Sequence, residues 1–116
     1  MDIEPTKKQF DGRLEIVREN IRMAAAKRGL NLSEVSRLAG MSRNGLGQFV
    51  NGRTSLSYAN ILSVCDVLQI PVGILHRQDA ITENRIRLYT WLERLPDHMA
   101  AQALALGQAT LTFSDG

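Results

Sequence analysis

Apolar residues recur at helical spacing along most of this chain, and no segment shows the alternation typical of a half-buried strand. In the first predicted helix, the apolar positions lie three or four residues apart: Phe10, Leu14, Val17, Ile21 and Ala24. Gly29 is expected to end this helix. The pattern predicts an all-α protein.

Two short helices are predicted to follow. Asn31 and Glu34 have the spacing of a capping box, which opens a helix with Val35 and Leu38 facing the core. Gly40 is expected to end that helix in the left-handed conformation. Two short helices joined by a turn of about three residues form a helix-turn-helix.

The second of these short helices is predicted over about residues 42–51, with Ser42 as its N-cap and Gly52 after its end. Its inward positions are Leu46, Phe49 and Val50. Ser57 is expected to cap a fourth helix, and Pro71 begins a short turn over 71–75. The apolar positions of that fourth helix are Tyr58, Ile61, Leu62, Cys65 and Leu68.

Residues 79–116 are predicted to form a separate helical hairpin beyond the domain of residues 1–78. One helix carries an apolar stripe up to Pro96: Ile81, Leu88, Leu92 and Leu95. Asp97 is expected to cap a last helix rich in Ala and Leu, two residues that favour helix.

Positive charge is concentrated in the first domain. Residues 13–53 hold eight Lys and Arg against Glu15, Glu19 and Glu34, a local charge of +5, whereas residues 79–116 hold three basic and five acidic residues. This asymmetry favours a polyanionic partner, although a solvated helix face also carries such charge.

The third predicted helix turns its amide side chains away from the core. With Leu46 pointing inward, a rotation of about 100° per residue places three amides on the opposite side: Asn44, Gln48 and Asn51. Asn and Gln bind adenine bidentately, and an arginine such as Arg43 binds guanine in the same way. Gly45 and Gly47 leave room for the backbone to approach DNA. The alternative is three solvated polar side chains.

Residues 10–75 resemble the Cro and lambda-repressor-like helix-turn-helix domains, called the XRE family. The resemblance rests on the run 29–34, Gly40-Met41-Ser42 at the turn, Leu46, and Asn51-Gly52-Arg53. It implies a five-helix domain whose third helix, the recognition helix, enters the major groove of double-stranded DNA. The residues that it implies for DNA binding are Ser42, Arg43, Asn44, Gly45, Gly47, Gln48, Asn51, Arg53, Thr54 and Ser55. Arg18, Arg22 and Lys27 are either further phosphate contacts or part of a solvated face.

Several positions depart from the family pattern. Leu32 stands where the family commonly has a glutamine that contacts a phosphate, and Ser36 stands where it has an alanine. Ala25 and Val50 replace an arginine–glutamate pair. Replacing both members of an ion pair by apolar residues is commonly neutral or stabilising, so we expect the fold to be kept.

The C-terminal hairpin is expected to build a two-fold dimer. The residues predicted for this contact are Ile81, Leu88, Trp91, Leu92, Leu95 and Leu104. The alternatives are that the hairpin packs back on its own domain, or that it binds another protein.

Catalytic, metal and membrane chemistry find little support in the sequence. Cys65 lies on an apolar face, His76 and His98 lie outside any cluster, and no cofactor or metal site is predicted. No apolar run is long enough to span a membrane, so we expect a cytoplasmic protein.

The sequence predicts a DNA-binding transcriptional regulator that is not an enzyme, most simply a homodimeric repressor at an inverted-repeat operator. The alternatives are an antitoxin-type autorepressor and a protein-interaction adaptor without DNA binding.

Overall fold

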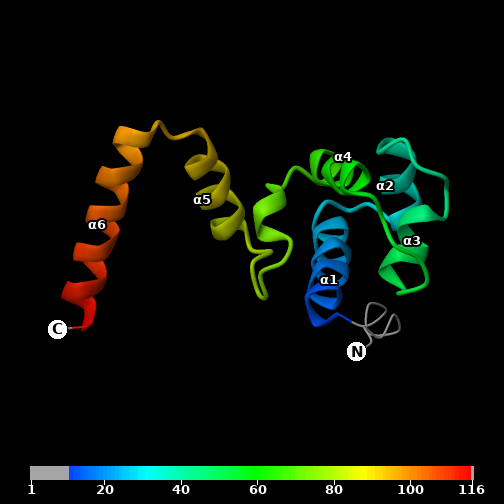
Figure 1. Ribbon diagram of the computed structural model, residues 1–116, viewed down its shortest axis with the longest axis horizontal. Coiled ribbons are helices and arrows are strands. Elements are labelled where there is room, and N and C mark those ends of the chain that lie inside the picture. Colours follow the sequence, from blue (N-terminus) through cyan, green and yellow to red (C-terminus); the bar gives the residue numbers. More distant parts are fainter. Residues whose placement is uncertain (1–10, 116) are drawn as a thin grey trace, which may run out of the picture.

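The computed structural model describes residues 11–115, which form helices and no strands (Figure 1). The prediction of an all-α fold is confirmed. The α-helices are α1 (Gly12–Lys27), α2 (Leu32–Leu38), α3 (Gly45–Val50), α4 (Tyr58–Leu68), α5 (Glu83–Arg94) and α6 (Asp97–Asp115), and the 3-10 helix η2 covers Val72–Ile74. Phe10, predicted at the start of the first helix, lies outside the described residues.

The core lies where α1, α2, α3, α4 and η2 meet. Its fully shielded side chains come from each of these elements: Ile21, Val35, Leu46, Leu68 and Ile74. Asn20 on α1 joins η2 to this core, because its side-chain amide donates to the carbonyl oxygens of Leu75 and Arg77 at 2.7 and 2.8 Å. The helices of the first domain are therefore held by apolar packing and by a buried polar link.

The predicted helix ends at Asn31, Gly40 and Ser57 are confirmed. Asn31 and Glu34 form both hydrogen bonds of the capping box, at 2.8 and 2.9 Å. The Ser57 hydroxyl accepts from the backbone N–H of Asn60 at the start of α4. Gly40 has φ +78°, a conformation that residues with a Cβ rarely adopt, and so turns the chain sharply after α2.

The predicted start of the third helix is wrong. The segment from Ser42 to Asn44 forms a turn, α3 begins at Gly45, and the backbone N–H of Gly45 donates to the carbonyl of Ser42 at 3.0 Å. The turn is so tight that a Cβ on Gly45 would lie only 3.0 Å from the Ser42 hydroxyl oxygen. The recognition helix therefore covers 45–50 instead of about 42–51.

Three residues predicted to face the core are exposed instead. Leu38, Tyr58 and Leu62 are 52%, 66% and 39% exposed. In α4 the fully buried Val64 takes the place expected of Leu62, so that helix is rotated about its axis relative to the prediction. Leu38 lies at the end of the two-turn helix α2, which buries Val35 and Ser36 instead.

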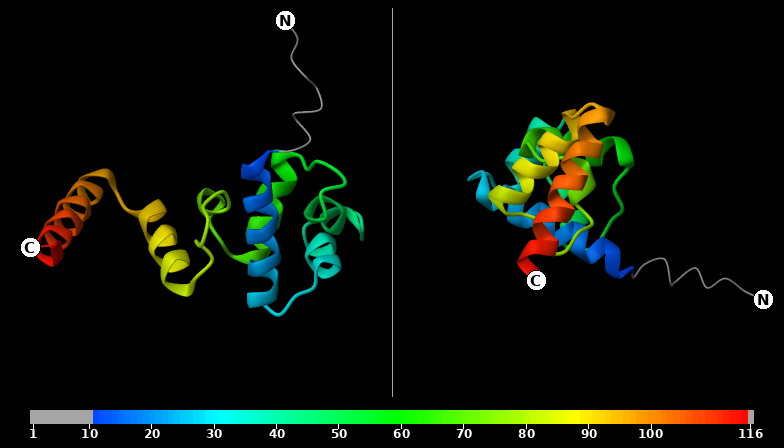
Figure 2. Two further views of the ribbon diagram at one scale, coloured as in Figure 1. Left: turned by 90° about the horizontal axis from the view of Figure 1, so that it is seen from below. Right: turned by 90° about the vertical axis from the view of Figure 1, so that its left-hand side faces the viewer.

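The C-terminal helices project from one side of the helical core (Figures 1 and 2). Ile86 attaches α5 to the core, whereas no α6 side chain through Thr112 is buried. The chain bends at Leu95 and Pro96, and α6 then runs apart from α5 (Figure 1). Helix α6 therefore does not pack back on its own domain.

Candidate nucleic-acid interface

A shallow hollow of about 270 Å³ lies between the start of α2 and the exposed side of α3. Its lining residues are Leu32, Ser33, Arg43, Asn44, Gly47, Gln48, Asn51 and Arg53. Six of the ten residues predicted to bind DNA are thus brought together on one surface. We call this surface the α2–α3 hollow.

The lining of the α2–α3 hollow combines positive charge with amide groups. Arg43 and Arg53 are exposed, and no acidic residue lines the hollow. The amides of Asn44, Gln48 and Asn51 are exposed beside them. Guanidinium and amide groups together provide the donors and acceptors that bind phosphate oxygens and base edges.

Helix α3 is held against α2 by a buried hydrogen bond. The hydroxyl of Ser36, which is fully buried, accepts from the backbone N–H of Leu46 at 2.9 Å. That N–H belongs to the first turn of α3 and has no partner within its own helix. Ser36, a departure from the family pattern, therefore satisfies a helix terminus that would otherwise lie unpaired in the core.

Arg18 holds α3 from the opposite side, against α1. Its Nε donates to the carbonyl oxygen of Phe49 at 2.8 Å, and its guanidinium lies 5.0 Å from the centre of the Phe49 ring. The Arg18 side chain also pairs with Glu15 and is only 7% exposed. The interpretation of Arg18 as a phosphate contact is therefore wrong, because the core occupies its guanidinium.

Arg28 and Arg22 also make contacts within the protein. Arg28 donates to the carbonyl oxygens of Leu68, the last residue of α4, and of Gln69, which caps that helix. Arg22 pairs with Glu19 at 2.9 Å. The positive charge of residues 13–53 is thus only partly directed outward. The positive charge at the α2–α3 hollow comes from Arg43 and Arg53.

Four predicted DNA-binding residues lie outside the α2–α3 hollow: Ser42, Gly45, Thr54 and Ser55. Gly45 is close to Met41 and Ser42, so the crowding in the turn is itself a reason for the missing side chain. Gly47 has no atom within 4 Å of where its Cβ would lie and does line the hollow.

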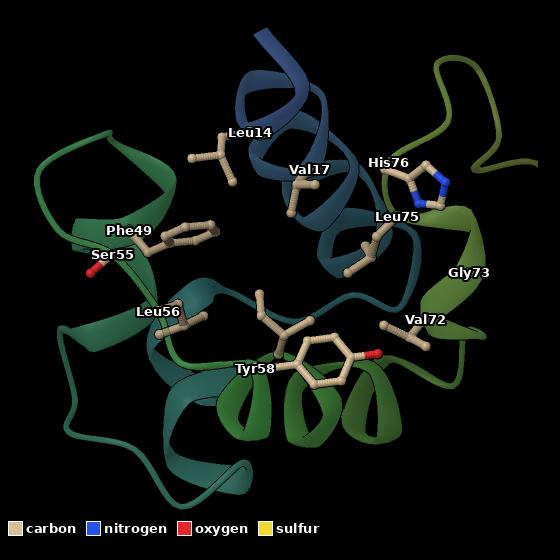
Figure 3. Close-up of a pocket in the computed structure, with 11 residues that line it drawn as sticks. Leu14, Val17, Phe49, Ser55, Leu56, Tyr58, Val72, Gly73, Leu75 and His76 are labelled. Atoms are coloured by element: carbon tan, nitrogen blue, oxygen red, sulfur yellow. The ribbon is translucent and has the colours of Figure 1, made fainter. Parts of the chain in front are cut away.

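Ser55 lies at the edge of a different cavity, of about 470 Å³, between α1, the start of α4 and η2 (Figure 3). Leu14, Val17 and Phe49 point into this mainly apolar cavity from α1 and α3. Its position places Ser55 on the α1 side of the recognition helix, away from the amides of the α2–α3 hollow.

Leu32 and Ser33 line the α2–α3 hollow but were not among the ten residues predicted to bind DNA. Both lie in the first turn of α2, directly after the Asn31 cap, and Ser33 is exposed. The capping box was the available signal, because it fixes where the first backbone N–H groups and side chains of α2 point. Ser33 places a hydroxyl donor beside the position where the family has its glutamine.

The predicted dimerisation residues separate into two groups. Ile81 is 6% exposed and belongs to the core, so it is not available to a partner. Leu88, Trp91, Leu92 and Leu104 line an apolar groove of about 740 Å³ between α5 and α6, which we call the C-terminal groove. Leu95 is half-buried at the bend and does not line this groove.

Cys65 has the properties of a core residue. It is 3% exposed, and burial, together with the charges of Asp66 and Glu93, raises the pKa of its thiol to about 12. At neutral pH the thiol is protonated and is a poor nucleophile. Among residues 11–115, no helix combines the length and apolar content needed to cross a bilayer, and no cluster of three potential metal ligands occurs.

A DNA-binding helix-turn-helix domain is defined by the adjacent short helices α2 and α3, the turn at Gly40 and the basic, amide-lined hollow. Residues 21–75 match a family model described as helix-turn-helix, from the middle of α1 through η2. This segment is a helix-turn-helix domain of the Cro and lambda-repressor-like XRE family. No curated protein and no solved structure matches the chain. A DNA-binding regulator is therefore the general class, and members of this family are typically not enzymes.

Proposed function

We propose that the protein is a homodimeric transcriptional repressor that binds an inverted-repeat operator through the α2–α3 hollow. The observation that carries the proposal is that one surface without acidic residues contains two exposed arginines and three exposed amides. An adaptor that had lost DNA binding would have no need for this combination.

Base recognition is assigned to Arg43, Asn44, Gln48 and Asn51. These side chains lie on or next to α3, which enters the major groove when α2 crosses the DNA backbone. Each bidentate contact to the correct base discriminates against a wrong base by about 1–3 kcal/mol.

Phosphate contacts are assigned to the flanks of the recognition helix. Arg53 and Thr54 follow α3 on an exposed loop, and Ser42 precedes it at the turn. On the α2 side, Ser33 supplies a hydroxyl donor. These contacts fix the position of the protein on the duplex without reading its sequence.

Dimerisation is assigned to α5 and α6. One recognition helix contacts too few base pairs to select a promoter among the competing sites of a genome, so two copies are needed. Leu88, Trp91, Leu92 and Leu104 are between 42% and 62% exposed, which is unusual for large apolar side chains on one hairpin. A two-fold dimer places its recognition helices about 34 Å apart, which corresponds to half-sites 10–10.5 base pairs apart.

Repression follows most simply from occupation of a promoter. Activation would require a further contact with polymerase, whereas the surfaces assigned above are used for DNA and for the partner chain. Exclusion of polymerase needs only that the dimer stay on its operator.

Selection of bound sequences from random duplex DNA tests the proposal. We expect an inverted repeat to be enriched and its affinity to fall steeply with salt, because each neutralised phosphate releases about 0.9 counterions. Enrichment of no motif, or an affinity that is unchanged from low to physiological salt, would contradict DNA-sequence recognition.

Matched variants then test the assigned roles on the selected site. Gln48→Ala is expected to cost about 1–3 kcal/mol on the selected site and to relax preference at particular base pairs. Arg53→Ala is expected to weaken selected and random DNA alike. Equal losses on both DNAs for Gln48→Ala would show that Gln48 does not read a base.

A further inference from the structure

Helix α6 is not stabilised by its own chain. It spans Asp97–Asp115, yet none of its side chains through Thr112 is buried, and its side facing α5 borders the open C-terminal groove. In proteins, most of the stability of a helix comes from packing of its apolar face and not from its intrinsic propensity. Helix α6 therefore needs a partner that fills the groove.

The side of α6 that borders the groove has a definite shape. Its middle is made of the small residues Ala100, Ala103 and Gly107 together with Thr110, and its edges carry Leu104 and Leu111 on one side and Leu106 on the other. Gln108 lies just beyond Leu104. At about 100° per residue, this apolar arc spans about 160°, wider than the stripe of about 100° that contact with one neighbour requires. Helix α6 is thus shaped to contact two helices at once.

The chemistry of the C-terminal groove limits what can occupy it. No charged side chain lines it, and its α5 wall is formed by Leu88, Trp91 and Leu92. The occupant must be a helix with a broad apolar surface and no charge along its length. The chain itself contains such a helix, because α6 has no charged residue between His98 and Asp115.

We propose that α6 of a second copy occupies the C-terminal groove, so that the two chains exchange their last helices in the dimer. This inference rests on the proposed homodimer and specifies how it is built. By two-fold symmetry, the α6 helices contact each other through Ala100, Ala103 and Gly107, whose small side chains allow close approach. The leucines at the arc's edges then reach α5 of the partner chain. In each groove, α5 and α6 of one chain are then both covered by α6 of the other.

A pair of alanine variants tests the contact between the two α6 helices. Ala103 lines the groove, whereas Ala105, two residues along, is exposed and does not line it. Ala103→Leu is expected to weaken dimerisation at least tenfold, because added bulk separates the helices. Ala105→Leu adds the same apolar group on the other side of α6 and is expected to leave the dimer unchanged. General apolar association would instead be strengthened by both variants.

Trp91, the one tryptophan of the chain, reports on occupation of the groove. It is 49% exposed without a partner, so its emission is expected to shift to shorter wavelength as protein concentration rises through the dimer transition. The transition is expected at higher concentration for Ala103→Leu and at the wild-type concentration for Ala105→Leu. Circular dichroism at a protein concentration above each transition checks that both variants keep their helices. An Ala103→Leu transition that coincides with the wild type would overturn the proposed helix contact.

Disulfide trapping distinguishes exchange from folding back. In a Cys65→Ala background, the double variant Leu92→Cys with Leu104→Cys is oxidised and run on a non-reducing gel. Exchange is expected to give a covalent dimer, whereas α6 folding back on its own α5 gives a monomer with an internal disulfide. If the wild-type protein binds the inverted repeat as a dimer but the double-cysteine variant forms only internal disulfides, exchange is refuted and the repressor proposal stands. A wild-type protein that stays monomeric and binds single half-sites would refute both.

Discussion

Replacement of Ser36 tests how the recognition helix is held in place. Ser36→Ala removes the hydroxyl that accepts from the N–H of Leu46 at 2.9 Å, and both groups lie in the core. A buried donor without a partner costs about 1–3 kcal/mol. Alanine has a higher helix propensity than serine and offsets about 0.5 kcal/mol of this cost. We therefore expect the free energy of unfolding to fall by about 0.5–2.5 kcal/mol.

The loss corresponds to a decrease in melting temperature of about 2–20 °C for a domain of this size. Thermal unfolding followed by circular dichroism measures it, with wild type and variant at equal concentration because the proposed dimerisation would shift the midpoint. Ser33→Ala, an exposed position on the same helix, is the matched control and is expected to change stability by less than about 0.5 kcal/mol. Equal melting temperatures for Ser36→Ala and wild type would refute the reasoning, since alanine is the residue that the family resemblance places there.

Three further predictions concern Arg18, Gly40 and Cys65. Arg18→Met is expected to speed hydrogen exchange at the α3 amides, and Arg18→Lys is not expected to restore protection, because an ammonium lacks the planar group that lies over Phe49. Gly40→Ala is expected to cost about 1–2 kcal/mol in urea unfolding because φ is +78°, whereas Gly47→Ala in α3 is expected to be neutral or stabilising by about 1 kcal/mol. Because the pKa of Cys65 is about 12 in the fold and about 8.5 in an unfolded chain, stability is expected to fall as pH rises above about 8.5. Urea unfolding between pH 8 and 11 should show a shallower decline for Cys65→Ala than for wild type.

Local signals in the sequence were sufficient to place most of the helices. The Asn31–Glu34 capping box and the Ser57 cap involve residues three apart, and the turn at Gly40 depends on one residue. Such features depend on the local chain alone and can be predicted from spacing. The prediction of Ser42 as an N-cap was wrong because serine favours both caps and turns. The crowding around Gly45 that selects the turn appears only in three dimensions.

The supports of the candidate site could not be predicted in the same way. Arg18 and the Phe49 carbonyl that it binds are 31 residues apart, and Ser36 and Leu46 are joined across two helices. The sequence shows a basic residue and a serine at these positions, and both residue types are ordinarily found at the surface. The outward position of the amides could be predicted, because one inward residue, Leu46, fixes the orientation of a short helix.

The links from Ser36 and Arg18 to α3 have a consequence for how the protein searches DNA. A helix of six residues with two glycines would not persist alone, yet these two links hold it against α1 and α2. We expect the protein to keep this reading surface formed while electrostatic attraction holds it on non-specific duplex. No folding event is then needed between contact with DNA and recognition of a base.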